Sequence, residues 1–286
     1  MKCRREVVFN GRGIIPLSAA LVVSGVLFLP GNSLADPQII ANLSDGGSTA
    51  SVDLTSSDGM NNWSVNGQNQ LHQQWFWYAI GSTAPQPINS LGLVSYNTIG
   101  LNEVTATYQN AQLTLSIDYV LAGGGVGSGS ADITESISAV NTSGGSMDFH
   151  FYQYSDFNLL GSGANDVVQL YGAAGSWNFV QQTAGASGIG EAIVAPSANH
   201  GEAALVGTTL AELNGLSPVT LNDSSSAGPG DVTWALQWDS TLANGGMFDL
   251  TKDKSLFIQV VPEPSGIALV ALGLGAWGMA RRRRPF

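Results

Sequence analysis

Apolar and polar residues alternate with a period of two along most of the chain between residues 36 and 261. The alternation is clearest at residues 113–121, 232–238 and 256–260. It places one face of a strand on a core and the other in water, as in antiparallel sheets. Shorter candidate strands lie at residues 50–54, 74–80, 104–108, 131–140, 147–154, 167–171 and 219–221. No apolar stripe with the helical period of 3.6 residues is sustained in this region.

Glycine-rich turns separate these segments. Residues 123–129 read Gly-Gly-Gly-Val-Gly-Ser-Gly, a composition that favours a loop. Many short strands divided by turn signals are typical of a sandwich or barrel. We therefore predict an all-β body, an antiparallel β-sandwich over residues 36–261. A boundary at residues 123–130 is the alternative to a single domain.

Residues 1–35 have the organisation of a secretory signal peptide. Basic residues in the first twelve positions precede an apolar stretch at residues 14–29, and a Pro-Gly pair follows. Ser33 and Ala35 place small residues at the −3 and −1 positions of a cleavage site before Asp36. We predict cleavage between Ala35 and Asp36, with the secretion translocon and signal peptidase as partners. An uncleaved membrane anchor is the alternative.

The C-terminal tail, residues 262–286, has three parts. An apolar run at residues 266–280 separates a Pro-Glu-Pro triplet from an arginine cluster. The residues concerned are Pro262, Glu263 and Pro264, and then Arg281, Arg282, Arg283 and Arg284. The run is somewhat short for a span of about 17–25 residues, but arginines can snorkel to the headgroups. Clustered arginines also hold their end of a transmembrane helix on the cytoplasmic side.

This arrangement resembles the PEP-CTERM sorting signal of Gram-negative bacteria. The resemblance covers about the last 25 residues. It implies recognition by an exosortase, a membrane-embedded cysteine protease, with cleavage in or near the motif. It also implies transient anchoring in the inner membrane through a short C-terminal helix and delivery to the envelope, the surface or the medium. Proteins of this kind are linked to exopolysaccharide and biofilm. An ordinary tail anchor is the alternative, but it gives no reason for Pro262–Pro264.

The charge balance narrows the partners of the body. Residues 36–261 contain 19 acidic residues, two basic residues and no arginine, hence a formal net charge of −17. Such a body repels phosphate backbones and anionic lipid, which excludes nucleic acid as a partner and disfavours lipid surfaces. Divalent cations and neutral glycans remain compatible. The single cysteine, Cys3, lies in the predicted leader, so the mature chain has no thiol chemistry.

Residues 147–157 carry the most suggestive side chains of the body. On a strand, one face would be apolar, and the other would carry an acidic and aromatic stripe of His150, Tyr152, Tyr154 and Asp156. Tyrosine rings stack on sugars, and imidazole and carboxylate groups hydrogen-bond hydroxyls, so the stripe is a candidate glycan-binding face. A solvated face, or a second packed layer with satisfied tyrosine hydroxyls, is the alternative. The aromatic run at residues 75–78 is interpreted as a strand buried on both faces rather than a sugar platform.

Catalysis has one candidate. Glu135 lies on the same side of its segment as Ile133 and Ile137, and an inward carboxyl would have a raised pKa, as a general acid requires. Asp148 or Asp156 would be the second carboxylate that glycoside hydrolysis needs. The alternative is an edge, a bulge or a shifted register that lets Glu135 reach water.

No metal or cofactor site is predicted. The three histidines are far apart in the sequence, and no metal-binding motif occurs. We therefore expect a non-catalytic envelope or extracellular-matrix protein associated with exopolysaccharide, with no cofactor. A secreted glycoside hydrolase or lyase acting on exopolysaccharide is the alternative.

Overall fold

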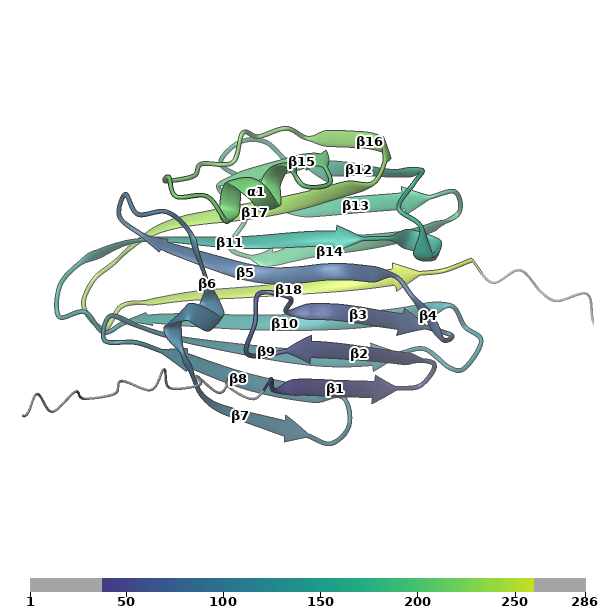
Figure 1. Ribbon diagram of the computed structural model, residues 1–286, viewed down its shortest axis with the longest axis horizontal. Coiled ribbons are helices and arrows are strands. Elements are labelled where there is room, and N and C mark those ends of the chain that lie inside the picture. Colours follow the sequence, from purple (N-terminus) through teal and green to yellow (C-terminus); the bar gives the residue numbers. More distant parts are fainter. Residues whose placement is uncertain (1–37, 260–286) are drawn as a thin grey trace, which may run out of the picture. The chain divides into compact units, whose positions relative to one another are not determined.

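Figure 1 shows the fold in a computed structural model that describes residues 38–259. The predicted signal peptide, the cleavage site at Ala35 and Asp36, the Pro-Glu-Pro triplet and the transmembrane helix lie outside the described residues. The described part is almost entirely β-structure, arranged in two antiparallel sheets of nine strands each. The predicted all-β fold with two facing antiparallel sheets is confirmed.

Sheet A has the strand order β1-β2-β3-β5-β11-β17-β15, with β4 paired to β3 and β6 to β5. Its strands are β1 (Ile40–Asp45), β2 (Ser48–Asp53), β3 (Met60–Val65), β4 (Gln68–Asn69), β5 (Leu71–Ile80), β6 (Gln86–Pro87), β11 (Met147–Phe157), β15 (His200–Leu205) and β17 (Val232–Leu242).

Sheet B has the order β16-β12-β13-β14-β18-β10-β9-β8-β7. Its strands are β7 (Leu93–Ile99), β8 (Glu103–Gln109), β9 (Leu113–Gly123), β10 (Ser130–Asn141), β12 (Asp166–Tyr171), β13 (Phe179–Ala184), β14 (Ser187–Ala195), β16 (Ser226–Gly230) and β18 (Met247–Phe257). Three short helical turns complete the described elements: η1 (Ile88–Leu91), η2 (Leu159–Gly161) and α1 (Thr208–Leu213).

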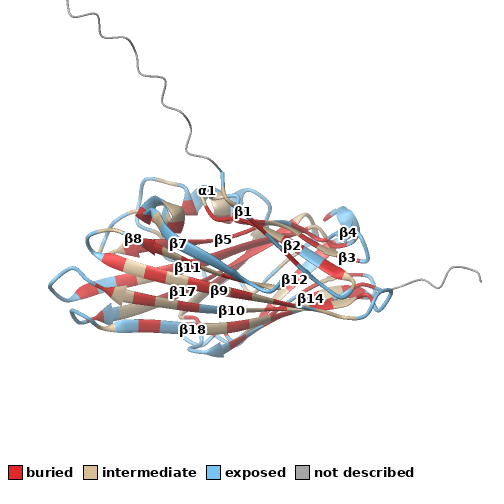
Figure 2. Cartoon of the chain, turned by 90° about the horizontal axis from the view of Figure 1, so that it is seen from below, coloured by how far each residue is buried: buried red, intermediate tan, exposed pale blue. Residues whose placement is uncertain are grey.

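The alternation in the sequence becomes alternation in burial. Strands β9 and β10 bury every second residue over most of their length, and Figure 2 shows the resulting bands along them. The facing apolar sides of the two sheets form the core. Within residues 38–259 this core extends from Ala41 to Ile258 and draws on both sheets, so we expect residues 36–261 to fold as one unit.

Two predicted segments differ from the structure. Residues 219–221 form no strand; they belong to the connection between β15 and β16. The strand predicted at residues 256–260 ends at Phe257 and begins earlier, at Met247. Its first half was missed because polar and charged residues interrupt the apolar alternation there.

The aromatic run at residues 75–78 is buried on both faces, as interpreted from the sequence. The rings of Trp75, Phe76 and Trp77 are fully buried, and Tyr78 is nearly so. Phe76 stacks on Phe151 of the neighbouring strand β11, with ring centroids 5.4 Å apart. Strand β5 lies within sheet A and is covered on both sides, which explains why its sequence does not alternate.

Candidate functional site

Sheet A presents a polar face on the side turned away from sheet B. Phe151 and Gln153 of β11 contact side chains of β18 in sheet B, so the residues that alternate with them point outward. The strand register then defines one outward face: Trp77 from β5; His150, Tyr152, Tyr154 and Asp156 from β11; Thr233, Gln237 and Asp239 from β17; His200 and Glu202 from β15. The stripe predicted on β11 is the middle row of this face.

Two imidazoles and two carboxylates form a chain at one end of the face. His150 Nδ1 lies 2.6 Å from Asp239 Oδ1, and His200 Nε2 lies 3.6 Å from the other oxygen of Asp239. His200 Nδ1 lies 3.0 Å from Asp223 Oδ2. The four side chains are 26–29% exposed, so this chain is accessible to a ligand.

The contacts in this chain shift three pKa values. The hydrogen bond to Asp239 raises the pKa of His150, against the opposing effect of burial, and the charges of Asp239 and Asp148 add to the rise. Burial by itself would raise the pKa of Asp239 and of Asp223, but their hydrogen bonds lower both. The arrangement therefore pairs a readily protonated imidazole with ionised carboxylates.

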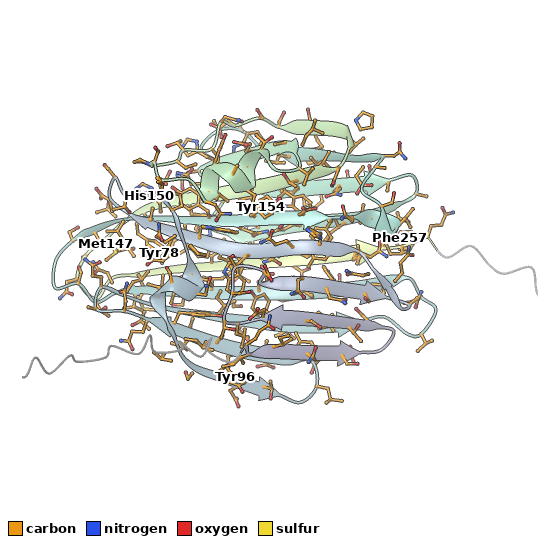
Figure 3. All side chains as sticks on the ribbon, in the orientation of Figure 1. Tyr78, Tyr96, Met147, His150, Tyr154 and Phe257 are labelled. Atoms are coloured by element: carbon orange, nitrogen blue, oxygen red, sulfur yellow. The ribbon has the colours of Figure 1, made fainter. Side chains whose placement is uncertain are left out.

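A shallow cavity of about 300 Å³ opens beside His150 and Asp239. Asp148, Ser82 and Thr241 also line it. All five side chains can exchange hydrogen bonds with hydroxyl groups. In Figure 3, His150 lies close to the Met147 end of β11, whereas Tyr154 lies farther along the strand.

The predicted stripe is divided between open and covered residues. His150 is half-buried, whereas Tyr152, Tyr154 and Asp156 are at most 3% exposed. The Tyr152 hydroxyl donates to Val219 O at 2.9 Å, and the Tyr154 ring packs edge-on against Trp77. As the structure stands, neither tyrosine offers a ring face to a sugar, because both rings are buried.

Asp156 is buried beside other acidic groups. Burial, opposed by the charge of His72 and reinforced by the charges of Asp231 and Asp166, raises the pKa of Asp156 to about 6. Asp156 therefore belongs to the covered part of the face and does not join the cavity at His150.

Glu135 points inward, as its spacing indicates, but it neither reaches water nor has the raised pKa of a general acid. It is fully buried between the sheets and contacts both lysines of the body, Lys252 and, at 2.7 Å, Lys254. Burial by itself would raise the pKa of Glu135, but the two ammonium charges lower it to about 2. Both sequence-based interpretations of Glu135 are therefore wrong.

A second carboxylate completes the buried ion cluster. Glu191 of β14 lies 3.2 Å from Lys252 and 3.8 Å from Lys254, and Gln153 of β11 donates to it at 2.7 Å. Two cations and two anions thus balance inside the sandwich. A signal was present in the sequence: the only two lysines of the body stand two residues apart, in phase with Leu250 and Leu256, and therefore share their buried side.

Within residues 38–259, no group of three or more His, Cys, Asp or Glu side chains is arranged to hold a metal ion. The same residues contain no helix that is long and apolar enough to cross a membrane. The residues that sequence reasoning missed are His200, Asp223 and Asp239. They come from separate parts of the chain, and only strand pairing brings them to His150.

Comparison with known proteins identifies the tail. Residues 260–284 match the PEP-CTERM protein-sorting motif, which confirms the resemblance based on Pro262–Pro264 and the terminal arginines. The motif implies that the protein is exported, transiently anchored in the membrane, processed at its C-terminus by an exosortase and sorted to the cell surface. No curated protein matches the chain significantly.

The fold of the body resembles that of solved sugar epimerase-like proteins. A GalM/aldose epimerase homologue from C. elegans is 7% identical, with a TM-score of 0.53 over 79% of this chain and 100% of its own. A putative aldose 1-epimerase from Escherichia coli K12 is 9% identical, with a TM-score of 0.50 over 79% of this chain and 100% of its own. At these identities the likeness concerns the fold alone.

Proposed function

Because the chain carries a PEP-CTERM sorting motif, we propose that it is a non-catalytic matrix protein of the cell envelope that associates with exopolysaccharide. In this proposal signal peptidase removes residues 1–35, and an exosortase then processes the tail near Pro262–Pro264. The β-sandwich is released to the envelope, the surface or the surrounding polymer. The sorting motif is the single observation that carries the proposal.

The surface of the sandwich favours a neutral polymer. Both lysines of residues 38–259 are fully buried, and this part contains no arginine. The described part therefore exposes carboxylates without any Lys or Arg charge to attract an anionic polymer. The polar cavity at His150 and Asp239 supplies hydroxyl-binding groups, which suits a neutral glycan. An anionic polymer would need divalent cations to bridge it to this surface.

Sorting can be tested by changing only the triplet. Replacing Pro262–Pro264 with three alanines keeps the apolar run and the arginines, and deleting residues 262–286 removes all three parts. We expect both variants to be lost from the surface and the medium, as measured by fractionation and immunoblotting. Normal delivery and processing of the triplet variant would show an ordinary tail anchor and would contradict the proposal.

A second candidate function rests on the pairing of His150 with Asp239. An imidazole held by a carboxylate beside a cavity can take up and release protons from a sugar, as general acid–base catalysis requires. The epimerase-like fold is compatible with such a role, but Glu135 is not part of it, since its carboxylate is buried and ion-paired. The test is turnover of aldoses or of exopolysaccharide, with His150→Asn as the variant. Activity that is lost in this variant would favour an enzyme over the matrix role.

A further inference from the structure

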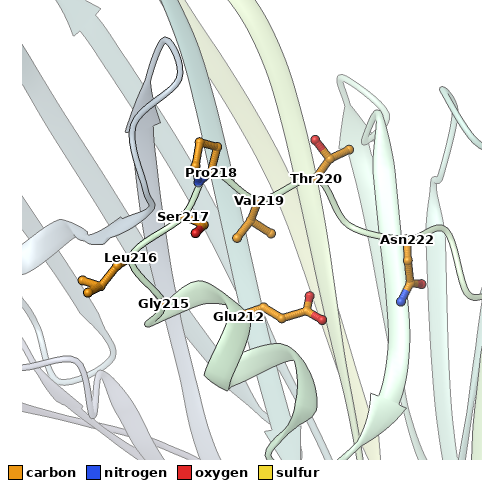
Figure 4. Close-up of a pocket in the computed structure, with 8 residues that line it drawn as sticks. All are labelled: Glu212, Gly215, Leu216, Ser217, Pro218, Val219, Thr220 and Asn222. Atoms are coloured by element: carbon orange, nitrogen blue, oxygen red, sulfur yellow. The ribbon is translucent and has the colours of Figure 1, made fainter.

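The connection between β15 and β16 covers part of the polar face on sheet A, where it contacts Trp77, Tyr152, Gln237 and Glu202. We call residues 207–222 the roof segment; it includes α1 and the extended stretch that follows (Figure 4). Two of its leucines, Leu213 and Leu221, are buried, and Leu210 and Val219 pack partly buried against the core. Most of its other residues are exposed, and Leu216 is 97% exposed.

Polar contacts join the roof segment to the face, and each contacted group of the face has its own partner in the roof segment. The Trp77 indole donates to Asn214 Oδ1 at 3.1 Å. The Tyr152 hydroxyl donates to Val219 O at 2.9 Å. The roof thus supplies the acceptors for both of these donors.

The acceptors of the face are matched in the same way. Gln237 Oε1 accepts from Leu221 N at 2.9 Å. Glu202 accepts from the Thr209 hydroxyl at 2.6 Å and from Asn222 N at 3.3 Å. Buried polar groups are costly unless they are hydrogen-bonded. This surface carries a carboxylate, an amide, a phenol and an indole, and each of them is matched by a group of the roof segment.

These groups make a typical carbohydrate-binding set. Indole and phenol rings pack on the apolar faces of sugars, while amide and carboxylate oxygens accept from hydroxyl groups. The hydroxyl, carbonyl and N–H groups of the roof occupy the positions that sugar hydroxyls would take. The set lies on the same face as His150 and Asp239, so the open cavity and the covered groups form one continuous row.

We propose that this whole face is a binding groove for a neutral oligosaccharide and that the roof segment closes it by standing in for the ligand. The inference rests on the proposed association with exopolysaccharide and adds the ligand class and a closed state. The carboxylates Glu202, Asp223 and Asp239 oppose an anionic sugar. A ligand that enters at His150 extends towards Tyr152 and Gln237 only when the roof segment lifts.

The roof segment has the features needed to move. It begins at Gly207, whose φ of 84° has open space around it. It ends just before Asp223, which is held by His200 and Trp177. Its two arms border an open hollow of about 390 Å³, lined by Glu212, the stretch 215–220 and Asn222 (Figure 4), so they do not pack tightly on each other. His200 also lies 3.6 Å from Asp239, which links the open cavity to the anchor of the roof.

A matched pair of variants tests the inference. Leu213→Ser removes the buried anchor of the roof and leaves the face intact, whereas Leu216→Ser makes the same change at an exposed position of the same segment. Binding is measured by affinity electrophoresis of residues 36–261 in gels containing starch, galactomannan, xyloglucan or dextran, with alginate as the anionic comparison. We expect Leu213→Ser to bind at least one neutral polymer ten times more tightly or better, because closure reduces the apparent affinity. Leu216→Ser should bind like the original protein.

Adding Trp77→Leu to the Leu213→Ser variant should abolish the gain, since the indole belongs to the groove. A folded Leu213→Ser variant that binds no neutral polymer more tightly than Leu216→Ser would overturn the inference. Normal sorting, or binding of the organism's own polymer through His150, would still support the proposed function. A failure of the roof inference can therefore be told apart from a failure of the proposed function.

If Leu213→Ser does not fold, hydrogen exchange of the unchanged protein tests whether a neutral polymer opens the roof segment. With galactomannan or another neutral polymer of the panel present, amides of the roof segment should exchange faster while those of β11 and β17 stay protected. Roof amides that exchange no faster with any of the four polymers would equally overturn the inference.

Discussion

The buried ion cluster gives the sharpest stability prediction. Glu135→Gln keeps the shape of the side chain but leaves Lys252 and Lys254 with a single carboxylate, Glu191. Breaking a buried ion pair by removing one partner costs about 3–5 kcal/mol. The loss has an upper limit, because Lys254 can instead release its proton. From its ordinary pKa of 10.5, neutralising a lysine at pH 7 costs about 5 kcal/mol. We therefore expect the free energy of unfolding to fall by about 3–5 kcal/mol.

The pH dependence separates this mechanism from simple loss of packing. Burial already lowers the pKa of Lys254 more than Glu135 and Glu191 raise it, and removal of Glu135 should lower it further. When the unfolded chain binds one more proton than the folded chain, the free energy of unfolding increases as the pH rises. The difference in the free energy of unfolding between the original protein and Glu135→Gln should therefore become smaller above pH 7, by at most about 1.4 kcal/mol per pH unit.

Urea unfolding of residues 36–261, followed by tryptophan fluorescence between pH 7 and 9, measures both effects. The double variant Glu135→Gln with Lys254→Met is the control, since it removes a cation together with the anion and should recover most of the loss. It also keeps the test open if the single variant does not fold. A loss below about 1 kcal/mol, or a gap that does not change with pH, would refute the assignment of a buried, charged cluster.

Three further predictions concern other sites. His150 should titrate in NMR above its ordinary pKa of 6.5, and Asp239→Asn should lower that value; an unchanged pKa would contradict the 2.6 Å contact. The pKa of Asp156 is raised to about 6. Its protonated form is therefore favoured in the folded protein, and the protein loses stability as the carboxyl ionises with rising pH. Asp156→Asn should accordingly stabilise the protein by about 2–3 kcal/mol at pH 8 and little at pH 4, and a difference independent of pH would speak against burial. Gly59→Ala should cost about 2–4 kcal/mol, since its φ is positive and an added Cβ would meet a tryptophan ring. Gly67→Ala, with a positive φ but open space, should cost only about 1 kcal/mol, and equal losses in urea unfolding would count against the packing there.

The fold could be predicted from the sequence where the local pattern reflects one buried face. Strands β9 and β10 were found because their side chains alternate between the core and the outside. Strand β17 was found because apolar and polar residues alternate in its sequence, although both of its faces are buried from Val232 to Trp238. Strand β5 was identified by its composition, since aromatic residues fill both faces. The roof segment could not be foreseen, because its conformation follows from contacts with distant strands and not from a period of its own.

The candidate site was only partly accessible to the same reasoning. The outward direction of His150 and Tyr152 followed from alternation, but their different exposure depends on the roof segment, more than 50 residues later in the chain. Likewise, the inward direction of Glu135 was foreseen, whereas its lysine partners come from β18, and strand pairing alone places them opposite.

One measurement tests the central claim most directly. Purified residues 36–261 are sedimented with the exopolysaccharide of the producing organism, with and without Ca²⁺, and the supernatant is assayed for protein and for released sugar. Depletion of the protein without new sugar fragments is the predicted result, and Ca²⁺ should be required only if the polymer is anionic. Protein that stays in solution under both conditions, or sugar fragments released from the polymer, would contradict a non-catalytic matrix role.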